Sequence, residues 1–211
     1  MEKQDFYLTN KEITQKTQET TAGSWNKLAQ GSLICALIIA VPVVATIILA
    51  QFFSWYVTLI MAIISFIVFA IMNYGYHSFM QDFVDSTTTK LSTLFSGFSK
   101  SVFKIIILHF VMLVVLAIGY ALFIVPGVLL TLRYSMTLFC LRDDNKLSVF
   151  KAMSKSGELM KDNYLRLFKT FFVNVKWLLL GLVTAGVGLL WLLPKYLTTK
   201  VIFYEDLKTD F

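Results

Sequence analysis

The feature that most constrains this chain is the absence of charge from a long apolar stretch. No Asp, Glu, Lys or Arg occurs between Lys27 and Asp82. A helix needs about 20 residues, each rising about 1.5 Å, to cross the hydrocarbon core of a bilayer. This stretch is long enough to cross twice, so the sequence predicts a transmembrane hairpin over residues 28–74 with its turn at 51–56.

The composition supports a membrane protein throughout. The chain is 57% hydrophobic and 15% charged, whereas soluble domains average about 45–50% and about 25%. Its polar first 30 residues predict no cleaved signal peptide, so the first span is expected to direct insertion. The net charge of +6 fits basic residues that flank spans and meet anionic lipid, and nucleic acid is not an expected partner.

The remaining apolar runs predict a single all-α membrane domain, a polytopic bundle of about six transmembrane helices. Its spans pair as three hairpins, over 28–74, 102–141 and 167–204. The polar segments are expected to hold short amphipathic cytoplasmic helices, one of them capped by Thr9 and Glu12 and one starting near Ser148. A third is predicted where Leu91, Leu94, Phe95 and Phe98 recur at helical spacing. The polar segments are 1–27, 75–101, 142–166 and the tail 205–211.

The three hairpins are similar in layout, which predicts an internal repeat. In each unit an aromatic and a basic residue precede a span, a break and a second apolar run. Pro126 and Pro194 break the second and third units, and Arg133 and Lys200 follow these prolines. Three glycines are also expected to loosen the chain at the breaks: Gly127, Gly186 and Gly188.

Charge predicts the orientation. The connections 51–56, 119–126 and 182–189 hold no Lys or Arg, and basic residues are retained on the cytoplasmic side. Six spans with both termini cytoplasmic is therefore the interpretation we favour. The alternative has four full spans, because the fourth and sixth runs are near or below the lower limit of about 17 residues for a span. In that case the two proline-containing stretches are re-entrant or interfacial.

Four features of the second half of the chain carry a family resemblance. They are VPGVLLTLRYSMTLFCLRDD from 125, SGELMKDNYLRLF from 156, Trp177, and GVGLLWLLPKYLTTKVIFYEDL from 186. Together they resemble the bacterial integral membrane family catalogued as domain-of-unknown-function 975. The matching positions are Pro126, Gly127, Tyr134, Ser135, Met136, Ser156, Leu159, Met160, Gly186, Gly188, Leu190, Trp191, Pro194, Phe203, Tyr204 and Leu207.

The resemblance covers most of the chain and is strongest from 125 to 207. It implies a multi-pass protein of the bacterial cytoplasmic membrane without an assigned activity. The sequence departs from the family pattern at Lys195, at Asp162 and at Lys176, where an apolar or small residue is expected.

The sequence offers little for catalysis. All 13 acidic residues fall outside the predicted spans, so no intramembrane carboxylate pair is expected for acid–base work or ion coupling. His77 and His109 each lack a further ligand at metal-binding spacing, and nucleophile and phosphate-binding motifs are missing. No cofactor or metal is expected, and the sequence predicts no enzyme. His109 is interpreted first as a hydrogen-bonded packing residue and alternatively as a proton relay.

Cations inside the apolar runs are the candidate binding residues. They are Arg133, Lys200 and Lys176, the last beside Asn174. A charge at mid-bilayer costs about 2.5–3.5 kcal/mol on insertion scales, so each side chain needs an explanation. One is snorkelling toward the cytoplasmic interface, which is harder for Lys176. The other is a cytoplasm-open basic crevice that binds an anionic head group or an acidic partner segment, with His109 as a further contact.

Three hypotheses follow. The first is a non-enzymatic membrane protein that binds lipid or another membrane protein, including a second copy of itself as a homo-oligomer; accessory, assembly and immunity roles belong here. The second is a carrier or exporter subunit for an anionic or amphiphilic substrate, suggested by broken helices and buried cations. The third is a membrane enzyme dependent on His77 or His109.

Overall fold

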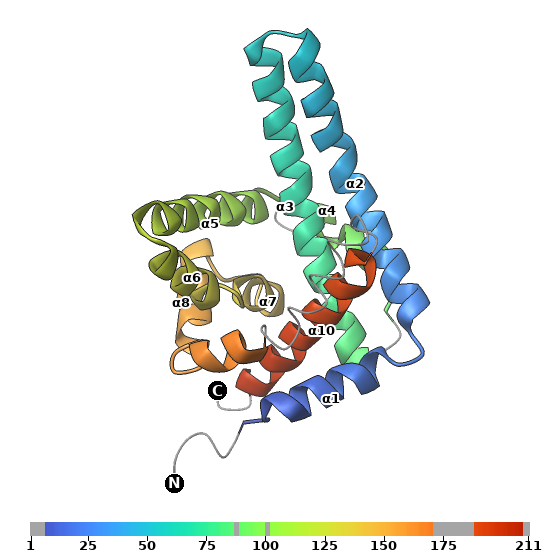
Figure 1. Cartoon of the computed structure of the whole chain (residues 1–211), viewed down its shortest axis with the longest axis vertical. Coiled ribbons are helices and arrows are strands. Elements are labelled where there is room, and N and C mark those ends of the chain that lie inside the picture. Colours follow the sequence, from blue (N-terminus) through green and yellow to red (C-terminus); the bar gives the residue numbers. More distant parts are fainter. Residues whose placement is uncertain (1–6, 87–88, 100–101, 171–187, 209–211) are drawn as a thin grey trace.

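The computed structural model describes residues 7–86, 89–99, 102–170 and 188–208 (Figure 1). Within these ranges the chain forms helices and no strand, which confirms the predicted all-α fold. Residues 164–170 are also helical and adjoin residues outside the description. The helices are α1 Asn10–Thr21, α2 Trp25–Phe52, α3 Trp55–Ser86, η2 Leu91–Phe95, α4 Ser96–Ser99, α5 Val102–Leu122, α6 Ile124–Arg133, α7 Thr137–Asp143, α8 Val149–Leu159 and α10 Leu189–Lys208.

Four described stretches are long and apolar enough to cross a membrane. They are Trp25–Phe52, Trp55–Ser86, Val102–Leu122 and Ile124–Asp143. They correspond to the first four predicted spans. The fifth predicted span lies largely outside the described residues, and the sixth corresponds to α10, which is not among these four.

Helices α2 and α3 pack side by side and extend as an arm away from the rest of the molecule (Figure 1). None of the residues 36–69, here called the first arm, is buried. The two helices are tied across the arm by a hydrogen bond of 3.0 Å between the Thr46 and Ser65 hydroxyls. Large exposed apolar side chains cover the arm, among them Val41, Ile48, Ile60 and Ile63.

Beyond the arm, α3 continues without a break past the predicted boundary at Tyr74 to Ser86. Its side chains there are mostly buried, including Phe79 and Phe83 at 0% exposure. They pack against α7, α10, η2 and α4, which together with α1, α8 and the inner end of α2 form the base. In the sequence this part of α3 belongs to the polar segment 75–101, predicted outside the span, but the base provides partners for its polar residues.

Helix α10 is the centre of the base. Val201, Phe203 and Tyr204 are completely buried, and the helix packs against α1, α2 and α3. The prediction that Pro194 breaks the chain is wrong, because α10 continues through it. Proline removes one backbone donor, but burial of Leu192 and Leu197 on either side holds the helix together.

Helices α5 and α6 form a second hairpin, and its residues 109–133 are here called the second arm. The chain reverses at Phe123, so Pro126 lies in the first turn of α6, where a missing N–H is tolerated. The predicted turn at Pro126–Gly127 is therefore displaced to Phe123. Gly127 is required by close packing, because a Cβ there would overlap the Tyr120 ring.

The run predicted as one returning helix over 128–141 is divided into α6 and α7 by a turn at 134–136. Ser156 of α8 forms hydrogen bonds with the backbone at this turn. Its hydroxyl donates to the Arg133 carbonyl oxygen (2.8 Å) and accepts from the Met136 N–H (3.2 Å). Helix α8 begins where expected, since Ser148 caps it by accepting from the Lys151 N–H.

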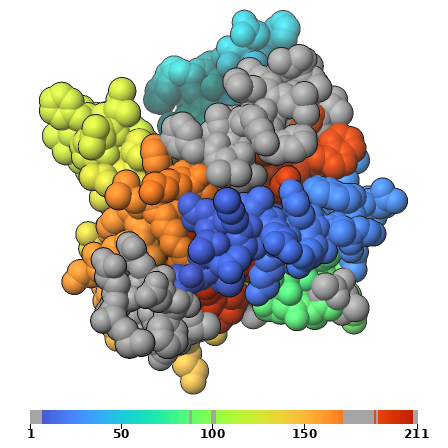
Figure 2. All heavy atoms as spheres, turned by 60° about the horizontal axis from the view of Figure 1, so that its bottom comes forward, coloured from blue at the N-terminus to red at the C-terminus, as the bar shows by residue number. Residues whose placement is uncertain are grey.

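The two ends of the chain pack together. Thr9 and Glu12 form the predicted capping box of α1, and α1 lies along α10 with Thr17 and Thr199 hydroxyls 3.2 Å apart. Figure 2 shows α1 in blue across this face of the base. Arg166 binds both the Leu8 carbonyl oxygen and Asp206, so the described N-terminal and C-terminal residues lie at the same end of the molecule.

Candidate functional site

Three elements of the base meet around the buried ring of Phe139 on α7. His77 of α3 contributes a ring whose centroid is 5.2 Å away, and Tyr204 of α10 another at 5.3 Å. Lys200, one turn before Tyr204 on α10, places its Nζ 5.6 Å from the same ring. These four residues are here called the Phe139 cluster.

A polar stripe on α3 brings the cluster together. Asn73, His77 and Gln81 follow one another at four-residue spacing, which places them on one face of a helix. His77 Nδ1 donates to the Asn73 carbonyl oxygen (2.9 Å) within the helix. At the outer end of the stripe, His109 Nε2 of α5 lies 3.5 Å from the Asn73 side-chain oxygen. The stripe thus connects a histidine of the third candidate span with the cluster.

Lys200 is the unusual member of the cluster. Its side chain is 8% exposed, and its Nζ lies between the rings of Phe139 and Tyr196, 5.8 Å from the latter. Among the described residues no carboxylate forms an ion pair with it. A buried charge without a partner is costly, and the two aromatic faces compensate for only part of that cost.

Asp143 lies at the charged end of the cluster. Its carboxylate accepts from Gln81 Nε2 (2.6 Å) and from the Tyr204 hydroxyl (2.8 Å), and pairs with Lys208 Nζ (2.9 Å). Burial lowers the pKa of Lys208, but the hydrogen bond and charge of Asp143, with help from Glu205, outweigh it and raise that pKa above its ordinary value. Asp143 therefore joins α3, α7 and the end of α10.

Arg133 lies apart from the Phe139 cluster. It is exposed at the end of α6, and its side chain crosses Gly157 of α8. Its guanidinium forms no ion pair in the described part of the chain. The structure therefore brings His109 and Lys200 to one stripe of α3 but leaves Arg133 at the contact of α6 and α8. Three other predicted residues, Asn174, Lys176 and Gly186, lie outside the described residues.

The predicted break at Gly188 lies directly before α10. The Gly188 carbonyl oxygen accepts from the Leu192 N–H (3.1 Å) and thus starts α10.

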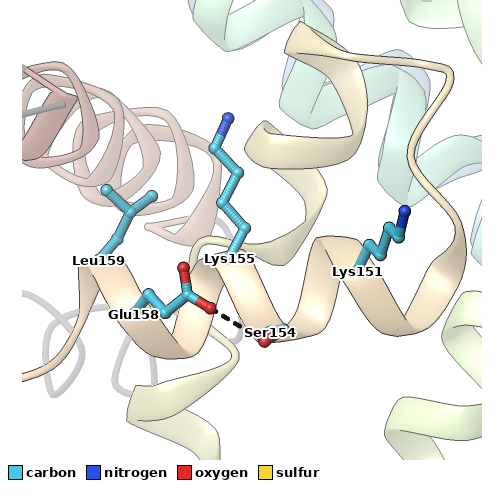
Figure 3. Close-up of a pocket in the computed structure, with 5 residues that line it drawn as sticks. All are labelled: Lys151, Ser154, Lys155, Glu158 and Leu159. Atoms are coloured by element: carbon cyan, nitrogen blue, oxygen red, sulfur yellow. Dashed lines mark hydrogen bonds between the residues drawn. The ribbon is translucent and has the colours of Figure 1, made fainter.

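A shallow hollow of about 280 Å³ lies on the outer face of α8 (Figure 3). The Ser154 hydroxyl donates to the Glu158 carboxylate (3.1 Å) at its floor, and Lys155 extends away from the helix beside them. Neither Lys151 nor Lys155 forms an ion pair with a described residue. The sequence did not single out this face, although its lysines four residues apart were a usable signal. The hollow is lined by Lys151, Ser154, Lys155, Glu158 and Leu159.

Metal-binding groups do not gather in the described ranges: three or more His, Cys, Asp or Glu side chains are nowhere close enough there to hold an ion. Cys35 and Cys140 are both buried free thiols. Residues missed by sequence reasoning are Phe139, Asp143 and Tyr204, whose partners come from distant parts of the chain.

The fold defines the class: a helical protein whose described residues include four stretches long and apolar enough to cross a membrane and a base built around α10. A family model described as "Protein of unknown function (DUF975)" matches residues 105–210, and the chain belongs to that family. The matched region includes α5 to α10 and thus every element of the Phe139 cluster except α3. No curated protein and no solved structure matches the chain.

Proposed function

We propose that this chain is a multi-pass protein of the bacterial cytoplasmic membrane that acts by binding lipid or another membrane protein, without catalysis. The observation that carries the proposal is the apolar surface of the two arms. Their large side chains, such as Ile63 and Ile118 at 52% and 57% exposure, are not covered by other described residues. Apolar surface of this kind costs about 25 cal/mol per Å² in water, and lipid removes that cost.

The packing of the described N-terminal and C-terminal residues against each other supports an even number of membrane crossings. Residues at both ends pack together through α1 and α10, and the tips of the arms hold no Lys or Arg, as cytoplasmic retention of basic residues requires. We therefore infer cytoplasmic termini. Four spans in the two arms keep the number even. The third hairpin of the six-span arrangement, 167–204, would include α10, but α10 packs against α1 and the inner end of α3 in the base. We therefore favour four spans, with the amphipathic faces of α1 and α8 at the cytoplasmic surface.

The second arm leaves the base in a different direction from the first (Figure 1). It is held mainly by the first two turns of α5, where Ile105 and Leu108 are buried and Lys104 Nζ donates to the Asn145 carbonyl oxygen (2.6 Å). For both arms to cross one bilayer, the second arm rotates about the first two turns of α5 until it lies alongside the first arm. The bilayer favours this, since it covers both apolar surfaces at once.

The basic residues beside the second arm indicate the chemical class of the group that the protein binds. Arg133 at the end of α6 and Lys151 and Lys155 on α8 present charges that no described carboxylate pairs. At a membrane surface such residues attract anionic head groups, each contributing about 1 kcal/mol. We propose an anionic phospholipid, or an acidic segment of a partner membrane protein, as the group bound here.

Native lipid analysis tests this proposal. The protein is extracted with its surrounding lipid in polymer-bounded discs, and the lipids and any second protein are quantified by mass spectrometry. We expect anionic phospholipid above its bulk fraction, and loss of most of that excess in the variant Arg133→Gln/Lys151→Gln/Lys155→Gln. The matched control removes three other exposed basic residues, Lys11→Gln/Lys16→Gln/Lys161→Gln, and should keep the excess. Bulk lipid composition without a second protein in comparable amount would contradict the proposal.

A second candidate function is a carrier for an anionic amphiphile, and Lys200 favours it. A buried cation at the end of a polar stripe that reaches His109 resembles the interior charges of transport pathways. Proteoliposomes with fluorescent phosphatidylglycerol and an external quencher measure such movement. Flux that Lys200→Leu leaves unchanged, relative to Lys155→Leu as control, would eliminate this mechanism.

A further inference from the structure

The short segment of η2 and α4 lies against α3 at one defined level. A Cβ at Gly75 would overlap the Leu94 carbonyl oxygen, and one at Gly97 would lie 2.6 Å from the Ile71 carbonyl oxygen. Leu94 is completely buried between these contacts. Backbone therefore packs directly on backbone, and the segment cannot slide along α3.

The same segment turns two aromatic rings away from the protein. Phe95 and Phe98 are 46% and 53% exposed, and their ring centroids lie 6.4 Å apart. Lys90, directly before η2, is exposed as well. An aromatic pair beside a basic residue is typical of segments that lie at the boundary between head groups and acyl chains. Phe95 ends η2 and Phe98 lies three residues later in α4, so the two rings are on one face; the predicted helix here is divided into a 3₁₀ turn and a short α-helix.

The length of α3 between the tip of the first arm and the level of this pair matches the thickness of a bilayer. Trp55 and Tyr56, at the tip of the first arm, are 77% and 55% exposed. Gly75 follows Trp55 by 20 residues, which is about 30 Å along a helix. That length equals the hydrocarbon core of a typical bilayer, about 30 Å. One exposed aromatic pair thus lies at each end of a bilayer-sized length of α3.

We propose that Phe95 and Phe98 are an interfacial anchor that binds the head-group boundary of the cytoplasmic leaflet and sets the depth of the first arm. This inference rests on the proposed membrane insertion of the arms. It places α3 beyond Gly75 in the cytoplasm, and it brings the start of α5 at Val102 to the surface from which that helix enters the bilayer. Exposed Phe103, at 83%, continues the same apolar face.

Spin-label depth measurements test the anchor in the full-length chain. Labels are placed singly in a Cys35→Ala/Cys140→Ser background at Phe98→Cys, at Ile63→Cys about 12 Å inside the expected outer boundary, and at Glu19→Cys on exposed α1. The protein is reconstituted in vesicles of phosphatidylcholine and phosphatidylglycerol. Accessibility to oxygen, which concentrates in the bilayer, and to a water-soluble nickel chelate gives the depth of each label.

We expect label 63 in the hydrocarbon, label 19 in water and label 98 between them at the boundary. A label at 98 that is as accessible to nickel as label 19, with label 63 still in hydrocarbon, overturns the anchor and leaves the proposed function standing. If label 63 is itself in water, the membrane proposal fails with it. A Phe95→Cys label provides an independent reading of the anchor should the Phe98 variant fold poorly, and it must give the same depth.

Discussion

The hydroxyl of Tyr204 donates a hydrogen bond of 2.8 Å to the carboxylate of Asp143. These residues lie on α10 and α7, and the bond joins the end of the C-terminal helix to the elements that follow the second arm. Gln81 and Lys208 bind the same carboxylate, so Asp143 connects three helices of the base.

Removing the Tyr204 hydroxyl should therefore loosen α10. A hydrogen bond to a charged group contributes about 1.5–3 kcal/mol, so Tyr204→Phe is expected to lower the free energy of unfolding by about that amount. Unfolding by denaturant in mild detergent measures it. Tyr120→Phe removes a hydroxyl that bonds Thr131 at an exposed site on the second arm and should cost less; equal losses would contradict the role of Asp143.

Lys200 should be replaceable by an apolar side chain of similar length. Because its buried charge lacks a described carboxylate partner, Lys200→Met is expected to raise the thermal midpoint of unfolding. An unpaired buried charge destabilises the folded state, and the methionine side chain fills similar space without that cost. The exposed Lys155→Met serves as control and should change little. A lower midpoint for Lys200→Met would indicate instead that a bound group pairs with this charge.

Gly75→Ala should disturb the contact between α3 and η2. The methyl group would overlap the Leu94 carbonyl oxygen, and overpacking costs about 1–3 kcal/mol, which exceeds the helix-propensity gain of about 1 kcal/mol. Gly31→Ala is the matched control, since its Cβ meets the movable ring of Phe79 at 2.9 Å. Thermal unfolding should show the larger loss for Gly75→Ala; a loss no larger than the control would contradict the backbone contact.

The second arm should lie beside the first in a bilayer. Spin labels at Ile63→Cys and Ile118→Cys, in a background without Cys35 and Cys140, report the separation of the two arms by pulsed dipolar spectroscopy. Helices packed side by side have axes about 8–10 Å apart, so we expect a short distance in vesicles. Arms that stay far apart in vesicles would contradict their common insertion.

The start of α1 should weaken in acid. Backbone and hydroxyl hydrogen bonds from Thr9 hold the pKa of Glu12 below its ordinary value of 4.5. These bonds stabilise the helix start above pH 4.5 and are lost as the pH falls through the lowered pKa. The mobility of a spin label at Lys16→Cys should rise at low pH, whereas Thr9→Ala should make it high already at neutral pH. Mobility unaffected by Thr9→Ala would show that the capping box does not hold the helix.

Local chemistry explains which parts of the fold were predictable. The first hairpin follows from a charge-free run, and the starts of α1 and α8 follow from caps at Thr9 and Ser148. The continuation of α3 beyond Tyr74 was not predictable, because Gln81 and Asp82 indicate a polar segment outside the span, and their partners Asp143 and Arg142 are distant in sequence. The break predicted at Pro194 was wrong for the same reason, because tertiary packing of α10 offsets the backbone hydrogen bond that proline cannot donate.

The sequence alone predicts helices long and apolar enough to cross a membrane, with two apolar hairpins before residue 142, because the length of an apolar helix and the thickness of a bilayer are compared without knowledge of any contact. The partners of the chain's polar residues do not follow from the sequence. Gln81 meets Asp143 across 62 positions. Lys200 and His77 both meet the ring of Phe139, and only where α3, α7 and α10 converge. Such partners depend on how the helices pack, and so the three-dimensional arrangement determines which cation is buried, which is exposed, and which aromatic rings stay on the surface.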